Sequence, residues 1–393
     1  MIKFIHCADL HLDAPFKLNY HVSDAIMEDI RRASFESFRR LVTDAIHQEV
    51  DFILIAGDLF DAKNQSLRTM IFLKEQFERL KDAHIFVYVI RGEADDIKYS
   101  RINWPSNVVV FGEQVETYEF ITKEGNVVYI HGFSYKEHMN YHNKLEQYPT
   151  NQVDSSIHIG LLHGTFVKHQ ARDPLTEFSQ EELNEKLYHY WALGHVHDRR
   201  LISELPHIHY PGNIQGTTMD ESGKKGYLLV TGDHVSMDVV FVPTQFIRFE
   251  EAQIKLTDTG KNAIYQDVTD FKNDQRTNGK CIYKIELINN SETLVKQSQL
   301  DELLSLLQQY ETHEQNFIWI DQLTLTQPHD GTTLHHEFDT ASLNDSTLFN
   351  DALSPLYHDE TFSRFLDNYE TFSKEELLAT GERKIKARMR DNE

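Results

Sequence analysis

The chain has 393 residues, of which 40% are hydrophobic and 26% charged, so it is long enough for one large soluble domain and one or two smaller ones. Its net charge of -23 argues against a plain DNA-binding protein, because phosphate contacts need clustered Lys and Arg, although bound metal ions can supply positive charge locally. No apolar segment is long enough to span a bilayer and no signal peptide is recognisable, so we expect a cytoplasmic protein without a membrane contact.

The first ninety residues alternate apolar runs with amphipathic stretches. We expect strands at 2–7, 52–56 and 85–90, and helices at 23–48 and 65–81. Ser23 is a suitable N-cap for the first helix. This order of strand, helix, strand, helix, strand is typical of a parallel sheet with right-handed crossovers.

Shorter apolar runs follow from residue 108 to residue 242. The predicted strands are 108–111, 117–121, 127–131, 157–162, 190–193, 207–210, 227–231 and 235–242, with an acidic helix near 179–188. The second and third of these strands read as an antiparallel hairpin, because only a short polar loop joins them. The last three suggest a second sheet packed face to face on the first. We therefore predict an α/β protein with a two-sheet core flanked by helices.

Pro243 marks the predicted end of this first domain, residues 1–243. Beyond it, strands at 246–256, 281–288 and 317–325 and helices near 264–273 and 297–310 predict a small α/β capping domain over 244–326. The polar residues 327–345 read as a linker. Residues 346–393 look helical, and their apolar positions suit either docking onto a partner or packing within the chain.

Five stretches place metal-ligand residue types directly after an apolar run. They contain Asp9 and His11, Asp58 and Asp61, Glu93 and Asp95, His163, and His195 and His197. Because strands of an open α/β sheet deliver their ends to one edge, we expect these residues to gather in one crevice, with Asp58 reaching two cations at once. Mixed carboxylates and imidazoles suit Mn, Zn or Fe, and two such ions about 3.5–4 Å apart suit phosphoester hydrolysis.

The motifs that carry this chemistry are CADLHLD at 7–13, AGDLFD at 56–61, LHG at 162–164, LGHVH at 193–197 and YPGNIQG at 210–216. They resemble motifs of the calcineurin-like metallophosphoesterases, and within that superfamily the SbcD-type DNA repair exonucleases and their YhaO-like branch, over about the first 245 residues.

The resemblance implies a role for each motif. Asp9, His11 and His197 would hold the first metal ion, His163 and His195 the second, and Asp58 both, with Mn favoured over Zn or Fe. Asn213 and Gln215 would contact the substrate, which would be DNA. In the resembled family the C-terminal region binds a coiled-coil SMC-like ATPase of the SbcC type. Whether the chain forms a homodimer stays open.

The third motif departs from the family. Where such enzymes carry Gly-Asn-His-Asp, this chain has Gly92, Glu93, Ala94 and Asp95. Glu93 can still bind the second metal ion, and we expect it to act with Asp95 in catalysis. Ala94 cannot supply the proton or hydrogen bond that the family histidine gives to the phosphate. We therefore expect metal binding to survive while hydrolysis is weakened.

Three functions remain compatible with the sequence. The first is a metal-dependent DNA nuclease subunit, which the intact motifs favour. The second is a phosphodiesterase for small substrates, because a fold and a metal centre do not determine the substrate. The third is a catalytically weak subunit that binds metal and an ATPase, which Ala94 favours.

Overall fold

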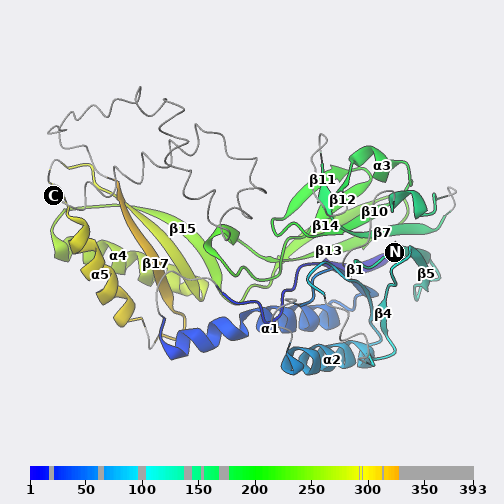
Figure 1. Cartoon of the computed structure of the whole chain (residues 1–393), viewed down its shortest axis with the longest axis horizontal. Helices are drawn as coiled ribbons and strands as arrows, with labels where there is room; N and C mark the ends of the chain where they lie inside the picture. The colour runs from blue at the N-terminus through cyan, green and yellow to red at the C-terminus, as the bar shows by residue number, and fades with distance from the viewer. Residues whose placement is uncertain are drawn as a thin grey trace, which may run out of the picture. The chain divides into compact units, whose positions relative to one another are not determined.

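The structure is a computed structural model, and it describes residues 1–16, 22–60, 66–95, 103–136, 144–151, 155–167, 177–291, 293, 295–311 and 314–326 (Figure 1). It distinguishes two units, Met1–Ile288 with Glu302–Thr326, and Asn289–Asp301 with Gln327–Glu393. The predicted linker at 327–345, the predicted helical region at 346–393 and the candidate residue Asp61 lie outside the described residues. The domain boundaries stay predictions.

The first sheet has the strand order β14, β13, β1, β2, β3, β4. Its strands are β1 (Ile2–Cys7), β2 (Phe52–Ala56), β3 (Phe86–Ile90), β4 (Val108–Val110), β13 (Gly226–Gly232) and β14 (Met237–Pro243). The run from β1 to β4 is parallel, which confirms the predicted crossover unit.

The place of β13 and β14 corrects a prediction. We expected these two strands in the second sheet, but β13 pairs antiparallel with β1, with Val230 opposite Phe4, and β14 follows as the edge strand. An alternating apolar pattern shows that a strand has one buried face, but it does not show which distant strand becomes its neighbour.

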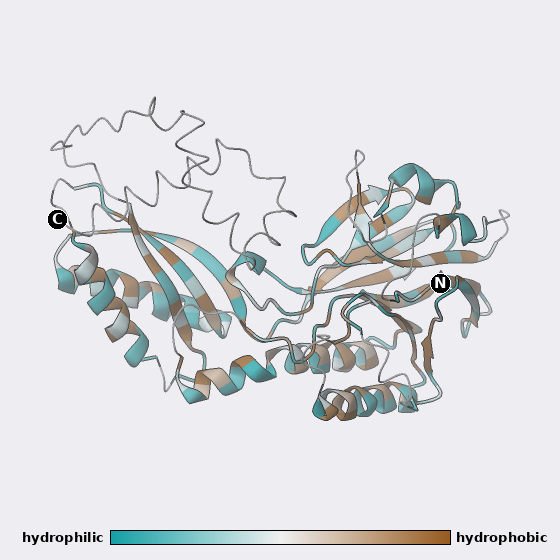
Figure 2. Cartoon of the chain, in the orientation of Figure 1, coloured by the Kyte–Doolittle hydropathy of each residue, from teal (hydrophilic) through white to brown (hydrophobic). Residues whose placement is uncertain are grey.

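Two helices cover the outer face of the first sheet, α1 (Asp24–His47) and α2 (Leu67–Asp82) (Figure 1). Each begins at a serine cap: the backbone N–H of Ile26 donates to Ser23 Oγ, and that of Thr69 donates to Ser66 Oγ. Both ribbons alternate hydrophobic and hydrophilic residues along their length, as expected for helices with one buried face (Figure 2).

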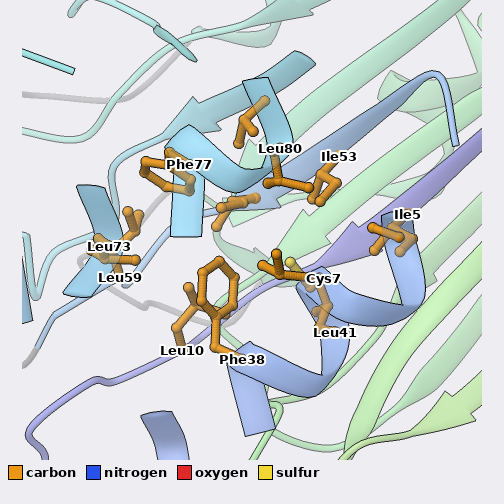
Figure 3. Packing of buried hydrophobic residues seen from close by; sticks show 14 of the residues in the cluster. Ile5, Cys7, Leu10, Phe38, Leu41, Ile53, Leu59, Leu73, Phe77 and Leu80 are labelled. Atoms are coloured by element: carbon orange, nitrogen blue, oxygen red, sulfur yellow. The ribbon is translucent and has the colours of Figure 1, made fainter. Parts of the chain in front are cut away.

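The buried faces of these helices meet the outward side chains of β1 and β2. Figure 3 shows this packing, with Ile5, Cys7, Leu10, Phe38, Leu41, Ile53, Leu59, Leu73, Phe77 and Leu80 labelled. Each fully buried side chain of this size contributes about 1.5–3 kcal/mol to folding. The cluster reaches the residues just beyond the strand ends, so it holds the loops that follow β1 and β2 in position.

The second sheet has the strand order β11, β12, β10, β7, β6, β5 and packs on the inner face of the first. Its strands are β5 (Glu116–Ile121), β6 (Val127–Gly132), β7 (Ile157–His163), β10 (Tyr190–Gly194), β11 (Arg200–Glu204) and β12 (His207–Tyr210). β5 and β6 pair antiparallel, which confirms the predicted hairpin, while β6, β7, β10 and β12 run parallel.

A buried histidine joins the two sheets. His6 of β1 lies 2.9 Å from the Tyr190 hydroxyl through Nδ1 and 3.0 Å from the Leu193 carbonyl oxygen through Nε2. Burial lowers its pKa to about 3, so the ring is neutral and serves as a structural link. This link between β1 and β10 holds the C-terminal ends of the two strands at the same edge of the core.

A third, parallel sheet of β15 (Arg248–Lys255), β16 (Cys281–Ile288) and β17 (Ile318–Thr326) follows. The remaining elements are β8 (Thr165–Phe166), β9 (Glu177–Phe178), α3 (Gln180–Asn184), α4 (Lys261–Gln275), α5 (Gln297–Gln309) and the 3-10 helices η2 (Leu145–Gln147), η3 (Met219–Glu221) and η4 (Arg276–Asn278). The strands and helices predicted beyond Pro243 are thus confirmed, while α3 is shorter than the predicted 179–188. No helix within the described ranges has the length and apolar character needed to cross a membrane.

Candidate metal centre

The ends of strands from both sheets meet at one edge of the core. Asp9 follows β1, Asp58 follows β2, His163 ends β7 and His195 follows β10. The loops after β1 and β2 run on side by side beyond the sheet: the N–H of Asp9 donates to the Gly57 carbonyl and that of His11 to the Asp58 carbonyl, at 3.1 and 3.0 Å. The expected convergence of these distant stretches is therefore present in the structure.

Several of these residues have a backbone conformation that L-amino acids rarely adopt. The φ angles of Asp9, His11, Asp58 and His195 are 52°, 40°, 51° and 96°. Each such residue costs free energy, and such residues persist where the surrounding structure holds them and their side chains have a task. The clustering of four of them at one sheet edge indicates a functional site.

Two glycines allow the two sheets to approach each other here. A Cβ on Gly57, whose φ is +94°, would lie 2.1 Å from His163 Nδ1, and a Cβ on Gly194 would lie 1.7 Å from the Ala56 carbonyl oxygen. Any larger residue would push β7 and β10 away from β2. These two positions therefore set the distance between the carboxylates of one sheet and the imidazoles of the other.

One group of donors consists of Asp9, His11 and His197. The Nε2 atoms of the two histidines lie 3.0 Å apart, so both rings point to the same place. The buried Asp9 carboxylate accepts the backbone N–H of His195 through both oxygens, at 3.0 and 3.1 Å. Three possible ligand atoms thus lie close together, and the assignment of these residues to a first ion stays a prediction.

A second group consists of Glu93, His163 and His195. The Glu93 carboxylate lies 2.6 Å from His163 Nε2 and 2.8 Å from His195 Nδ1. Burial by itself lowers the pKa of His163, but the carboxylates of Asp58 and Glu93 raise it well above its ordinary value. Glu93 therefore lies where it could bind a cation together with His163 and His195, and its role as a ligand to the second ion stays a prediction.

Asp58 lies between the two groups. Its Oδ2 is 3.6 Å from His11 Nε2 and 3.7 Å from His163 Nε2, so one oxygen faces a histidine of each group. Its Oδ1 accepts the backbone N–H of Ala94 at 3.0 Å, which fixes the rotation of the carboxylate. This is the geometry required of an acid shared by two cations.

Two buried carboxylates of the site form ion pairs only with histidines among the described residues. Asp9 is 1% exposed and Asp58 3%, and no Lys or Arg among the described residues forms an ion pair with either. Burial raises the pKa of Asp9, and Asp58 adds to the increase against the opposing effect of His163. Buried carboxylates with converging imidazoles fit two divalent ions of the Mn, Zn or Fe kind.

Manganese is accordingly expected to stabilise the folded chain. At a free concentration 100-fold above Kd, each ion bound only to the folded state adds about 2.7 kcal/mol to the free energy of unfolding. Urea unfolding of the chelator-treated chain with and without Mn²⁺, with NaCl added to equal ionic strength, measures this difference. An unchanged unfolding midpoint would contradict the binding of manganese at this site.

Asp95, for which a part in catalysis was expected, binds two backbone amides. Its Oδ1 accepts the N–H of Phe60 and its Oδ2 that of Gly92, both at 3.0 Å, and the residue is 6% exposed. Burial and the neighbouring Asp58 raise its pKa to about 7. Because both oxygens are used on backbone amides, the contacts favour a positioning role in which Asp95 ties the 92–95 loop to the residues after β2.

Asn213 and Gln215 are also placed differently from the expectation that they contact the substrate. They are 1% and 2% exposed. Gln215 Oε1 accepts the N–H groups of Phe246 and Ile247, and its Nε2 donates to the carbonyls of Gly216 and Ile247. The side-chain amides of Asn213 and Gln215 are therefore buried in the core, where Gln215 holds the backbone of residues 246–247.

Replacing Gln215 with leucine is expected to lower the free energy of unfolding by about 3 kcal/mol, because several buried backbone groups lose their partners. Urea unfolding of the metal-free protein measures the change. The exposed Gln253, which makes one surface hydrogen bond to Glu286, is the matched control, and Gln253→Leu should change stability by less than about 0.5 kcal/mol. Equal effects of the two substitutions would contradict the proposed role of Gln215 in holding residues 246–247.

Two residues near the site had no signal in the sequence. Glu221 of η3 accepts a hydrogen bond from His197 Nδ1, and the ammonium of the buried Lys225 donates to the His197 carbonyl at 2.9 Å. Burial raises the pKa of Glu221, but the hydrogen bonds from His197 and Thr217 outweigh it and hold the pKa at about 2. Both residues follow His197 by more than twenty positions, so only folding brings them to it.

The chain is similar in sequence to known proteins. Residues 2–199 match the family model of the calcineurin-like phosphoesterases. The chain is 37% identical over 327 residues to an uncharacterized metallophosphoesterase, YhaO, of Bacillus subtilis (strain 168), covering 81% of this chain and 80% of that protein. The chain therefore belongs to the calcineurin-like phosphoesterases, a family of metal-binding hydrolases.

More distant similarity extends to DNA double-strand break repair proteins. The chain is 26% identical over 204 residues to the DNA double-strand break repair protein Mre11 of Sulfurisphaera tokodaii, covering 51% of this chain and half of that protein. It is 25% identical over 325 residues to Mre11 of Saccharolobus solfataricus, covering 78% and 80%. A crystal structure of a dimetal phosphatase from Danio rerio aligns with a TM-score of 0.35 and 13% identity, over 61% of this chain and 95% of that one.

Proposed function

We propose that the protein is a manganese-dependent phosphodiesterase that acts on DNA, as the nuclease subunit of a cytoplasmic repair complex. The position of Asp58 Oδ2 between His11 and His163 carries the first part of this proposal, because two-ion hydrolysis needs an acid shared by both ions. Similarity to the Mre11 proteins supports DNA as the substrate class.

The chain's own residues hold the metal-ligand side chains in fixed orientations and supply most of the negative charge of the site. When bound, two divalent ions neutralise the phosphodiester and lower the pKa of the attacking water. The backbone amides of His195 and Ala94 hold the carboxylates of Asp9 and Asp58 in fixed orientations. Glu93 joins His163 to His195. Such preorganised ligands need little rearrangement during the reaction.

Residue 94 sets the expected level of activity. Its backbone N–H touches the shared carboxylate, yet its methyl group has no proton to give to the reacting phosphate or its leaving group. A slow phosphodiesterase is the result that this substitution favours. The same observation supports the second candidate function, a subunit that binds metal and an SMC-like ATPase of the SbcC type but hydrolyses little.

A cleavage assay with a range of substrates separates these functions. The full chain with Mn²⁺ is given linear double-stranded DNA, single-stranded DNA and bis-p-nitrophenyl phosphate, each with and without chelator. Chelator-sensitive cleavage of DNA is the expected result. Cleavage of the chromogenic ester alone would instead indicate a small-substrate phosphodiesterase, and full metal occupancy without any cleavage would indicate the weak subunit.

A further inference from the structure

The carboxylate of Glu221 is joined to the metal centre through His197. His197 Nδ1–H donates to Glu221 Oε1. The other oxygen, Oε2, accepts the backbone N–H of Thr217 at 2.6 Å and its hydroxyl at 3.1 Å. The Glu221 side chain is 14% exposed. Both of its oxygens are thus occupied by donors, and neither is directed at Asp9 or His11.

The hydrogen bond determines which nitrogen of His197 carries the proton. A neutral imidazole has one N–H, and a carboxylate at Nδ1 can only accept, so the proton stays on Nδ1 and Nε2 keeps its lone pair. That Nε2 lies 3.0 Å from His11 Nε2, in the group that also contains Asp9. A carboxylate that accepts the N–H of a metal-ligand histidine also increases the basicity of the imidazole ring.

We propose that Glu221 is a positioning residue that holds His197 in the metal-binding tautomer and orientation. It lies beyond residues 2–199, the segment that matches the family model. The inference rests on the proposed metal centre and is independent of whether DNA is the substrate. It assigns to the short η3 segment a function in cation affinity, which Thr217 supports by fixing the rotation of the carboxylate.

The substitution Glu221→Gln separates this role from a structural one. Thr217 presents its N–H and its hydroxyl to one end of the side chain, so the glutamine oxygen is drawn to that end and its NH₂ group faces His197 Nδ1. An NH₂ donor there makes Nδ1 an acceptor and moves the ring proton to Nε2, which then points N–H at the cation position. Glutamine should therefore impair metal binding at least as much as alanine, although it keeps the shape of the side chain.

Titration of the full-length chain with Mn²⁺, followed through the electron paramagnetic resonance signal of free Mn²⁺, measures affinity without any reaction. We expect Glu221→Gln and Glu221→Ala each to weaken one of two binding events by about 10- to 100-fold. Asp220→Asn is the matched control, because the neighbouring Asp220 is exposed and loses the same charge. It should bind Mn²⁺ like the unmodified chain.

Three outcomes decide the matter. Weak binding by Glu221→Gln together with normal binding by Asp220→Asn supports the proposal, provided that the metal-free variants unfold at an unchanged urea concentration. Normal binding by Glu221→Gln with weak binding by Glu221→Ala overturns it and leaves Glu221 a structural role in holding residues 217–221. Absence of two Mn²⁺ ions in the unmodified chain would refute the metal centre itself, which is a separate result.

Discussion

Replacing Ala94 with histidine is expected to raise the rate of phosphodiester hydrolysis by about 10²- to 10⁴-fold, the contribution of one well-placed proton donor. The backbone N–H of residue 94 lies 3.0 Å from Asp58 Oδ1, so a side chain at this position starts beside the shared carboxylate. The measurement is the turnover number with Mn²⁺ on linear DNA and on a chromogenic phosphodiester.

Ala94→Phe is the control for this gain. It adds a ring of similar size without an N–H group, so it should leave the rate unchanged or lower it. Mn²⁺ affinity should be similar in all three proteins, because residue 94 offers no ligand in the unmodified chain. If histidine produced no gain in rate, the role assigned to residue 94 would be wrong.

Asp58→Asn is expected to lower hydrolysis by at least about 10²- to 10³-fold and to reduce the bound Mn²⁺ below two ions per chain. The N–H of Ala94 donates to Oδ1, so asparagine will place its oxygen there and its NH₂ group between His11 and His163. An amide nitrogen in that place has no lone pair for a cation, so the position shared by both ions loses its ligand.

Asp58→Asn removes one of two neighbouring buried carboxylates but also a partner of His163, and because these two effects oppose each other we expect a smaller change in the stability of the metal-free fold than in metal binding. Metal analysis by mass spectrometry and urea unfolding after chelation measure the two effects separately. The exposed Asp82 at the end of α2 provides the matched control, and Asp82→Asn should change neither. Two ions retained by Asp58→Asn would contradict the bridging assignment.

Much of the fold could be predicted because its signals are local. The parallel unit from β1 to β3, the hairpin of β5 and β6, and the Ser23 cap of α1 all follow from apolar period and flanking residues. The pairing of β13 with β1 did not follow, because a strand's partner depends on contacts more than two hundred residues away. The local sequence pattern therefore predicts whether a segment is a helix or a strand, but not which strand it pairs with.

The loop residues show the same limit at the site. Asn213 and Gln215 lie in one of the motifs that carry the family resemblance, and that resemblance implied a contact with substrate. Burial and four hydrogen bonds to backbone make Gln215 a clamp instead. The sequence alone does not reveal whether the hydrogen-bonding groups of a polar loop residue are already satisfied within the fold. Such a residue can therefore be interpreted as functional when its role is structural.

The sequence by itself determined which acids and histidines come together at one sheet edge, because residues directly after apolar strands are carried there by the strands themselves. Only the tertiary structure decided how those residues act: that Asp58 lies between the two groups, that Asp95 binds backbone amides, and that Glu221 directs His197. The physical reason is that the chemical type of a side chain is a property of one residue, whereas its tautomer, orientation and charge depend on residues that contact it only after folding.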